Sequence, residues 1–327
     1  YVVTEWGDAT AANDATATPQ AEGGFFREMG SFAYGLYFGN ESRGQNSMRN
    51  GTATGGFANF ATVGDSNFLH HDNALDVFFA GDMGVQWGAR LHYASNEDNS
   101  NTAIAKEQSA LGLGFGVVMG DVEAYANLDL KDESTGATAA GDKWEADSGL
   151  NLGLKYNHMG MNLFADYDKV GAEYTAAGAA AVKTEQTTIK VGAARIHEVS
   201  STARVLFDLR YVKTDAKDTK VDGTTQELND SQLPLTIGFE TEATSWLTLR
   251  GSVSQSVVIN KKETKNTTTT KATTDNTTNV NAGATLNFGK MKVDGRVGYN
   301  SAAVSTKKDG GLRTDELLST VGVSYWF

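Results

Sequence analysis

The sequence has no cysteine, only two prolines, and no uninterrupted apolar run near the length of a membrane-spanning helix. Without cysteine, a disulfide-stapled domain and a thiolate metal site are both excluded. Proline cannot donate a hydrogen bond to a sheet ladder, so its scarcity suits a chain that is mostly sheet. The missing apolar run excludes a transmembrane helix. It does not exclude a membrane β-barrel, whose strands are only half apolar.

Positive charge is also scarce, with 28 Lys and Arg against 40 Asp and Glu and a net charge of −12. A general basic surface is absent, so we expect no nucleic-acid partner. The 327 residues allow one large all-β domain or two ordinary domains. The opening stretch YVVTEWGDAT shows no signal peptide, so a targeting segment, if the protein is exported, is expected to have been removed.

Apolar and polar residues alternate in segment after segment from residue 31 onward. In Ser31–Asn40, for example, Phe32, Tyr34, Leu36 and Phe38 fall on one face, which is the period of a β-strand. Most segments are long enough to cross a bilayer when tilted, which takes about 9–11 residues. Residues 31–327 therefore predict a sheet of about fourteen strands. Residues 1–30 are predicted to precede this sheet. If the sheet forms a membrane barrel, they would be a periplasmic tail or a plug in the barrel lumen.

Short and long connections take turns between these segments. The long, polar ones are residues 41–73, 97–106, 132–143, 173–184, 215–229, 261–277 and 305–313. Strict alternation places every short turn at one end of the sheet and every long loop at the other. This sorting predicts an all-β, transmembrane antiparallel up-and-down β-barrel with short periplasmic turns and long extracellular loops. A soluble β-sandwich has no reason to sort its loops in this way.

Aromatic residues gather near the predicted strand ends, where an aromatic girdle would meet the lipid headgroups. They are Tyr93, Trp144, Tyr156, Tyr167, Tyr211, Trp246, Phe288, Tyr299 and Tyr325. The alternative is that they form the edges of an ordinary aromatic core in a soluble barrel.

The chain closes on TVGVSYWF, in which Val321, Val323, Tyr325 and Phe327 share one parity. This ending resembles the carboxy-terminal signature of Gram-negative outer-membrane β-barrel proteins. The resemblance implies that the last strand is an assembly signal for the barrel-assembly machinery. It also implies a location in the bacterial outer membrane, with the lipid bilayer and lipopolysaccharide as partners. No particular porin family is indicated, and the oligomeric state stays open. Loop 132–143 does not resemble the long constriction loop of classical sixteen-stranded trimeric porins.

If one parity of each strand faces lipid, the other faces the lumen. A charge on the lipid face would cost about 2–4 kcal/mol at the bilayer midplane, so charged side chains should share the inner face. The predicted pore-lining residues are Arg90, Glu123, Asp129, Lys155, Asp166, Asp168, Lys190, Arg204, Asp208, Arg210, Glu240, Arg250, Lys292, Asp294 and Arg296.

These side chains carry both signs in similar numbers, and the function they favour is a porin-like channel. It would pass small hydrophilic solutes or ions by passive diffusion through a mixed-charge lumen. The alternative is a non-transport surface or structural barrel whose loops bind a partner. We expect no cofactor, no metal site and no enzymatic activity. An enzyme would have to use His71 or Asp72, but neighbouring residues of a strand point to opposite faces, so a shared metal is awkward.

The first long connection, residues 41–73, contains GGFANFATVGDSNFLHH. This stretch is too apolar for a freely solvated loop. Two arrangements would bury it. The connection either folds into the barrel as a constriction or packs on a neighbouring subunit.

Overall fold

The computed structural model describes residues 2–7, 20–39, 67–69, 71, 74–147, 149–265, 268–271, 276–300 and 318–326. Its regular elements are strands, joined in one antiparallel sheet. No helix in this part of the chain is long and apolar enough to cross a membrane.

The first nine strands are β1 (Val2–Gly7), β2 (Gln20–Met29), β3 (Phe32–Phe38), β4 (Leu75–Asp82), β5 (Gln86–Asp98), β6 (Lys106–Met119), β7 (Val122–Thr135), β8 (Lys143–Ala146) and β9 (Gly149–His158). The remaining strands are β10 (Met161–Thr175), β11 (Val182–Ser200), β12 (Ala203–Thr219), β13 (Thr225–Thr244), β14 (Leu247–Lys265), β15 (Thr268–Lys271), β16 (Thr277–Phe288), β17 (Met291–Asn300) and β18 (Leu318–Tyr325).

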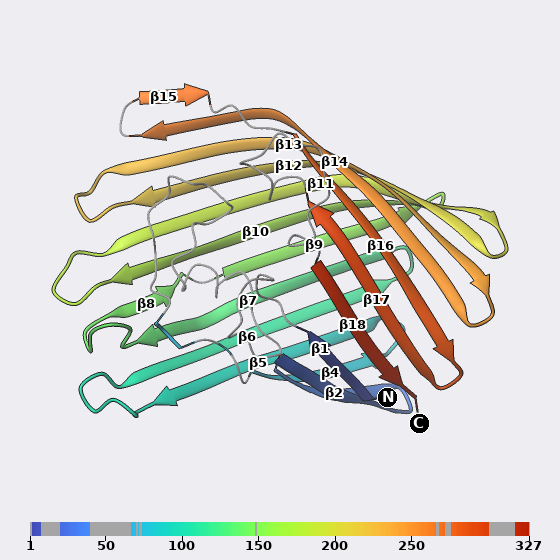
Figure 1. Ribbon diagram of the computed structural model, residues 1–327, viewed down its shortest axis with the longest axis horizontal. Helices are drawn as coiled ribbons and strands as arrows, with labels where there is room; N and C mark the ends of the chain where they lie inside the picture. The colour runs from blue at the N-terminus through green and yellow to red at the C-terminus, as the bar shows by residue number, and fades with distance from the viewer. Residues whose placement is uncertain are drawn as a thin grey trace.

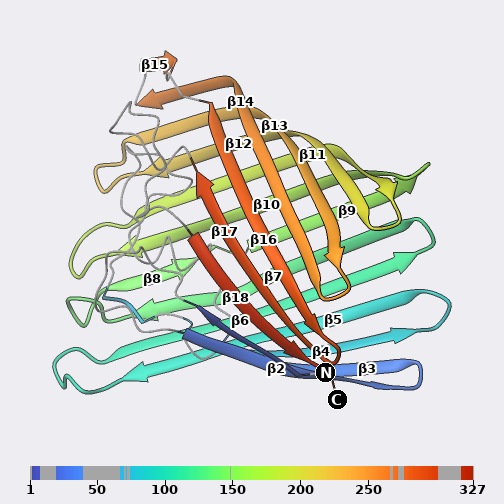
Figure 2. The same cartoon turned by 45° about the vertical axis from the view of Figure 1, so that its right-hand side comes forward.

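The sheet closes on itself into a barrel (Figures 1 and 2). Strand β1 pairs with β2 on one side and with β18 on the other, so that Val2 lies opposite both Phe25 and Tyr325. Of the 18 described strands, β8 and β15 have only four residues each. They add hydrogen-bonded pairs at the ends of longer neighbouring strands and are not counted as separate strands of the ring. Removing these two leaves sixteen strands around the ring. Because the ring is closed, its strands leave no unpaired edge along the wall.

The predicted fold class is confirmed, and the sheet has more strands than the expected fourteen. The extra ones come from residues 1–30, which were expected to precede the barrel. The structure instead places Val2–Gly7 and Gln20–Met29 in the wall, paired with each other and with β18 and β3. The sequence hid them because β1 is short and because β2 carries Gly23-Gly24 and Phe25-Phe26, which break the alternation.

The short turns lie together at one end of the barrel, which we call the short-turn end (Figure 2). They join β2 to β3, β4 to β5, β6 to β7, β9 to β10, β11 to β12, β13 to β14 and β16 to β17. At the β9–β10 turn, Met159 and Gly160 have φ of 52° and 76°. Positive φ at both central residues is the conformation whose twist suits a two-residue hairpin.

Several long connections are shorter than expected, because the strands continue past the apolar part of the wall. Strands β11 and β13 have 19 and 20 residues. As a result, half of the predicted loop 173–184 and two thirds of the predicted loop 215–229 are strand. Both faces are polar there, so period-two hydrophobicity gives no signal. In the same way, the predicted loop 261–277 contains the end of β14, the strand β15 and the start of β16, whereas 305–313 lies outside the described residues.

The two faces of the wall differ as the alternation predicts. On β12, the outward Phe207, Leu209 and Tyr211 are exposed, whereas the inward Asp208 between them is buried. Farther from the short-turn end, the outward residues of the same strand become Lys213 and Asp215. The outer face is therefore an apolar band followed by a charged band.

Candidate functional site

The inner face of the barrel has two regions that differ in what covers them. One, which we call the covered wall, is the inner face of β4–β10, against which residues 67–69, 71 and 74, here called the docked segment, pack. The other, which we call the open wall, is the inner face of β12–β17 near the short-turn end. Predicted site residues occur in both regions.

Apolar packing holds the docked segment against the covered wall beside β8. Phe68 is buried in a cluster with Ala137, Trp144 and Ala172. Its ring meets that of Tyr174 edge to face, with 5.9 Å between centroids. Trp144 was expected in the aromatic girdle, but it is fully buried on the inner side, so that expectation was wrong.

Hydrogen bonds fix the same segment. His71 Nε2 lies 2.9 Å from Asp132 Oδ1, and both side chains are 1% exposed. Ser134 Oγ donates to the Leu69 carbonyl over 3.2 Å, and Lys106 Nζ donates to the Asn67 carbonyl over 2.6 Å. The end of the connection expected to form a constriction therefore does fold inward. The rest of 41–73 lies outside the described residues.

Next to this segment, Asp76 of β4 is fully buried. Its Oδ1 accepts from Arg90 Nε and from His92 Nδ1, each at 2.8 Å. The His71 and His92 rings are 5.8 Å apart between centroids, which makes the two polar groups neighbours. A buried carboxylate is tolerated only when charged or polar partners satisfy it, and Arg90 and His92 supply them.

A chain of polar contacts continues across the covered wall. Asn127 donates to Asn151 over 3.1 Å, and Asn151 donates to Asp168 over 3.5 Å. Glycines make room for these side chains. A Cβ on Gly114 would lie 2.8 Å from Asn127 Oδ1, and one on Gly149 would lie 2.3 Å from Asp129 Oδ2.

Nearer the short-turn end, the contacts across the covered wall join charged groups. Lys155 Nζ donates to Glu123 over 2.7 Å. The Tyr125 hydroxyl donates to Asp166 over 2.7 Å. Asp166 also lies opposite Lys190 in the register of β10 and β11. These ionic groups are partly exposed to the enclosed space.

Between the two regions, Arg210 clamps Asp208 with two hydrogen bonds, of 2.7 Å from Nε and 2.5 Å from Nη2. The guanidinium also lies 5.6 Å from the centroid of the Phe164 ring. Such a cation–π contact helps to fix the direction of the charge. Phe164 is therefore an aromatic side chain on the inner face.

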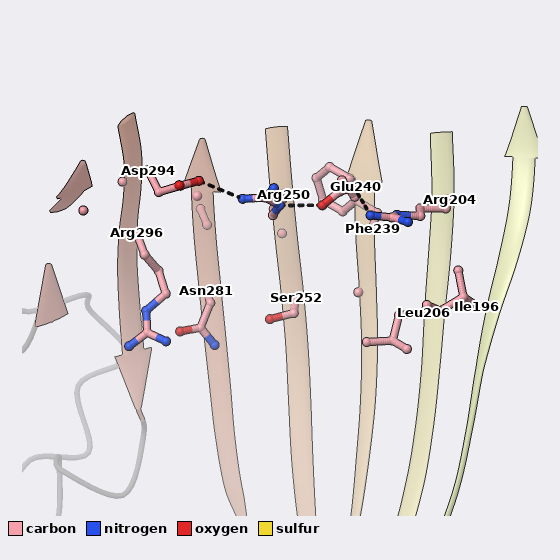
Figure 3. A pocket seen from close by; sticks show the side chains of 16 residues that line it. Ile196, Arg204, Leu206, Phe239, Glu240, Arg250, Ser252, Asn281, Asp294 and Arg296 are labelled. Carbon is pink, nitrogen blue, oxygen red and sulfur yellow. Dashed lines mark hydrogen bonds and ion pairs between the residues drawn. The ribbon is translucent and has the colours of Figure 1, made fainter. Parts of the chain in front are cut away.

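The open wall carries a row of ion pairs across four strands (Figure 3). Glu240 on β13 is flanked by Arg204 on β12 and Arg250 on β14, and it pairs with both. Arg250 Nη1 also donates to Thr285 Oγ1 over 2.6 Å and reaches Asp294 on β17 over 3.3 Å. About half of the Arg204, Arg250 and Asp294 side-chain surface is exposed, so the row faces the enclosed space.

One step farther from the short-turn end, Arg296 lies beside Asn281, with Ser252 at the same level (Figure 3). These residues and the ion-paired row line a recess of about 770 Å³. At the short-turn end of β17, the Lys292 ammonium lies 5.2 Å from the Trp326 ring.

The fifteen predicted pore-lining side chains share the inner parity of their strands, and most exposed apolar residues lie on the opposite parity. Tyr125 and Ile196 are exposed residues that lie on the inner parity. The distribution of the fifteen side chains was not foreseen, however: most fall into the two regions, whereas Lys190 on β11 and Asp208 and Arg210 on β12 lie between them.

Sequence reasoning also missed Asp76 and Asp132, and it considered His71 only as a residue that an enzyme would have to use. Asp76 stands alone within an apolar strand, which is the one signal that could have found it. Asp132 was hidden because a bulge at Leu130 reverses the parity of β7.

Among the predicted assembly-signal residues, Val321, Val323 and Tyr325 are exposed on the outer face of β18. Phe327 lies outside the described residues. Of the expected girdle, Tyr93, Tyr156, Tyr211, Trp246, Phe288 and Tyr325 are exposed. His71 is bonded to Asp132, whereas His70 and Asp72 lie outside the described residues. The described part of the chain holds no group of acidic or histidine side chains able to bind a metal.

Comparison with known proteins finds similarity in structure only. No family model and no curated protein matches the chain. A porin refined at high resolution is 12% identical, with 100% of this chain and 98% of that chain covered and a TM-score of 0.46. OmpT, an outer membrane protein of Vibrio cholerae, is 12% identical, with 100% and 95% covered and a TM-score of 0.43. A variant of the Rh. blastica porin is 12% identical, with 99% of each chain covered and a TM-score of 0.35.

Proposed function

We propose that the protein is an outer-membrane channel that lets small hydrophilic solutes or ions diffuse passively through its barrel. The observation that carries this proposal is the division of the wall into an apolar outer face and a charged inner face within a closed ring. Unpaired charges are stable on the inner face only if water reaches them, and an apolar outer band is stable only if lipid covers it.

The outer face supports a position in the bilayer. Beyond the apolar band, outward lysines and carboxylates pair along and between strands, as in Lys131–Glu133 and Lys213–Asp215, both at 2.7 Å. The hydrogen bond from Lys131 lowers the pKa of Glu133, and the one to Asp215 raises the pKa of Lys213. Groups held charged in this way suit the headgroup level, where lipopolysaccharide is the proposed contact.

The inner face supports passage with limited selectivity. The open wall keeps its charges solvated and of mixed sign, so the overall preference of the channel between cations and anions would be weak. On the opposite side, the docked segment occupies part of the enclosed space and is held there by noncovalent contacts. The proposed channel is therefore partly obstructed along the covered wall and open along the charged, open wall.

Planar-bilayer recording of the refolded protein tests the proposal. We expect stable conductance steps that rise with KCl concentration and a reversal potential close to zero in a salt gradient. Heat-unfolded protein from the same preparation serves as the control and should give no steps. Protein that inserts, as judged by protease protection, and never conducts would contradict the channel and favour the non-transport barrel.

The non-transport alternative has one observation of its own. Strands β11 to β14 extend past the apolar band and present a charged collar that a partner could contact. Deleting residues 266–276 tests it: loss of partner or cell-surface binding with unchanged solute uptake would favour this alternative over the channel.

A further inference from the structure

The recess in the open wall is unfilled because its floor is made by glycines. Gly238, Gly283 and Gly322 line it on the inner parity of β13, β16 and β18. A Cβ on Gly322 would meet nothing within 4 Å, and a Cβ on Gly238 would meet its nearest atom at 3.5 Å. Side chains would therefore fit at both positions, yet the sequence leaves about 770 Å³ open.

The charges lining the recess do not balance. Among the described side chains that line it, three guanidinium groups, of Arg204, Arg250 and Arg296, face two carboxylates, of Glu240 and Asp294, which leaves one positive charge. Both carboxylates are already engaged, Glu240 by Arg204 and Arg250, and Asp294 by Arg250. Within the described part of the chain, Arg296 has no carboxylate partner. The excess charge is therefore that of Arg296.

Neutral hydrogen-bonding groups stand beside this guanidinium. Ser252 and Asn281 are opposite each other in the register of β14 and β16, and both side chains point into the recess with Arg296 (Figure 3). A guanidinium offers two parallel N–H donors, which match the two oxygens of a carboxylate or of a phosphate. An amide and a hydroxyl can donate to the remaining oxygens.

We propose that this recess binds a small oxyanion, the carboxylate or phosphate group of a solute, through Arg296, Asn281 and Ser252. The proposal rests on the proposed channel function, because solutes reach the recess through the enclosed space. The ion-paired row provides the fixed electrostatic surroundings, and Arg296 makes the direct contact with the anion. The channel would then retain anionic solutes at one wall while passing them.

Equilibrium dialysis of the refolded full-length protein in detergent micelles tests the site without requiring conduction. The probes are radiolabelled inorganic phosphate and radiolabelled succinate. We expect saturable binding at one site, and a loss of affinity of about tenfold in Arg296→Gln, which removes a charge-assisted pair. Asn281→Ala should lose less, and Arg296→Lys should retain part of the affinity.

Two further variants make the result unambiguous. Arg195→Gln removes the same charge from an exposed position on the outer parity of β11 and should leave the affinity unchanged. Ser252→Leu fills the recess without removing a charge and should abolish binding, which keeps the test valid if Arg296→Gln does not fold. Equal affinity in wild type, Arg296→Gln and Ser252→Leu would overturn the site, as would the absence of saturable binding by either probe.

The two probes also identify the source of the anion. Mutual competition supports a general oxyanion site, binding of phosphate alone supports a phosphorylated solute, and binding of succinate alone supports a carboxylate solute. Bilayer recordings separate this proposal from the channel itself. A protein that conducts but binds neither probe would contradict the proposed anion site and support the proposed channel. A protein that binds anions but never conducts would support the proposed anion site and contradict the proposed channel.

Discussion

The covered wall and the open wall use similar charged residues under opposite conditions of solvent. In the covered wall, Asp76 and Asp132 are almost completely buried and each is bonded to a histidine. In the open wall, Arg204 and Arg250 are about half exposed. Removing one partner of a buried charge leaves an uncompensated group, whereas exposed pairs contribute little to stability. The covered wall should therefore govern stability, and the open wall should govern the passage of ions.

The largest effect should come from the apolar anchor of the covered wall. Trp144→Ala removes a fully buried side chain beneath Phe68 and should lower the free energy of unfolding by about 3–5 kcal/mol. The measurement is urea unfolding in detergent micelles, followed by tryptophan fluorescence and by the mobility shift of the folded barrel in gels. Trp246→Ala, at a 50% exposed tryptophan, is the matched control and should cost less than about 1 kcal/mol. Equal losses in the two variants would remove the distinction between the walls.

The second-largest loss of stability should come from the hydrogen bond between His71 and Asp132 in the covered wall. His71→Ala leaves the Asp132 carboxylate without its hydrogen bond from His71 and should cost about 1.5–3 kcal/mol. We also expect larger single-channel conductance, because the docked segment would lose its hydrogen bond from His71 to the wall. Asp132→Asn, which keeps the shape and removes the charge, should have the smaller effect. Unchanged stability and conductance in His71→Ala would mean that the segment is held by apolar contacts alone.

A third prediction concerns pH at the loop end of the covered wall. Burial alone would raise the pKa of Asp142, but hydrogen bonds from Ala177, Ala139 and Thr138 outweigh it and lower the pKa below the usual 3.8. A lowered native pKa means that this stabilisation is complete above pH 3.8 and is lost as the pH falls through the native value.

Asp142→Asn should therefore cost about 1–2 kcal/mol at neutral pH and make the acid loss of stability shallower. Unfolding curves between neutral pH and pH 2 give both quantities. Asp98→Asn is the control, because Asp98 also has a pKa lowered by hydrogen bonds from Ser100 but lies half-buried at the end of β5. An unchanged acid profile in Asp142→Asn would contradict the assignment.

The smallest change in stability should come from the open wall, together with the clearest change in selectivity. Arg250→Gln breaks exposed pairs with Glu240 and Asp294 and should cost about 0–1 kcal/mol. Because it removes positive charge from the enclosed space, the reversal potential in a KCl gradient should shift toward cation selectivity. Lys213→Gln removes an equal charge from the outer face and should shift the potential less. A loss of several kcal/mol in Arg250→Gln would show that this row is structural.

Much of the wall could be predicted from the sequence, because period-two alternation reports directly on lipid and water. The fold class and the inward parity of residues such as Arg204 and Glu240 follow from that pattern. It fails where both faces meet the same environment. The extensions of β11 and β13 are polar on both sides, and β2 carries adjacent aromatics and adjacent glycines.

The covered wall could not be predicted, because it depends on contacts between residues far apart in the chain. His71 and Asp132 are separated by 61 positions, and a bulge decides which way Asp132 points. Trp144 was predicted to be a girdle residue because the alternating pattern shows where a strand ends. The pattern does not show which other segment of the chain packs over that strand end. Local sequence patterns carry no information about such docking.

The most direct test uses the absence of cysteine from the native chain, which lets one thiol report on one position. Ser254→Cys places a thiol on the inner face of β14, and Val253→Cys places one on the adjacent, 50% exposed outer position. In proteoliposomes, a membrane-impermeant maleimide should label Ser254→Cys, whereas Val253→Cys should react only after detergent is added. Equally rapid labelling of both thiols in intact proteoliposomes would contradict a wall with water on one side and lipid on the other.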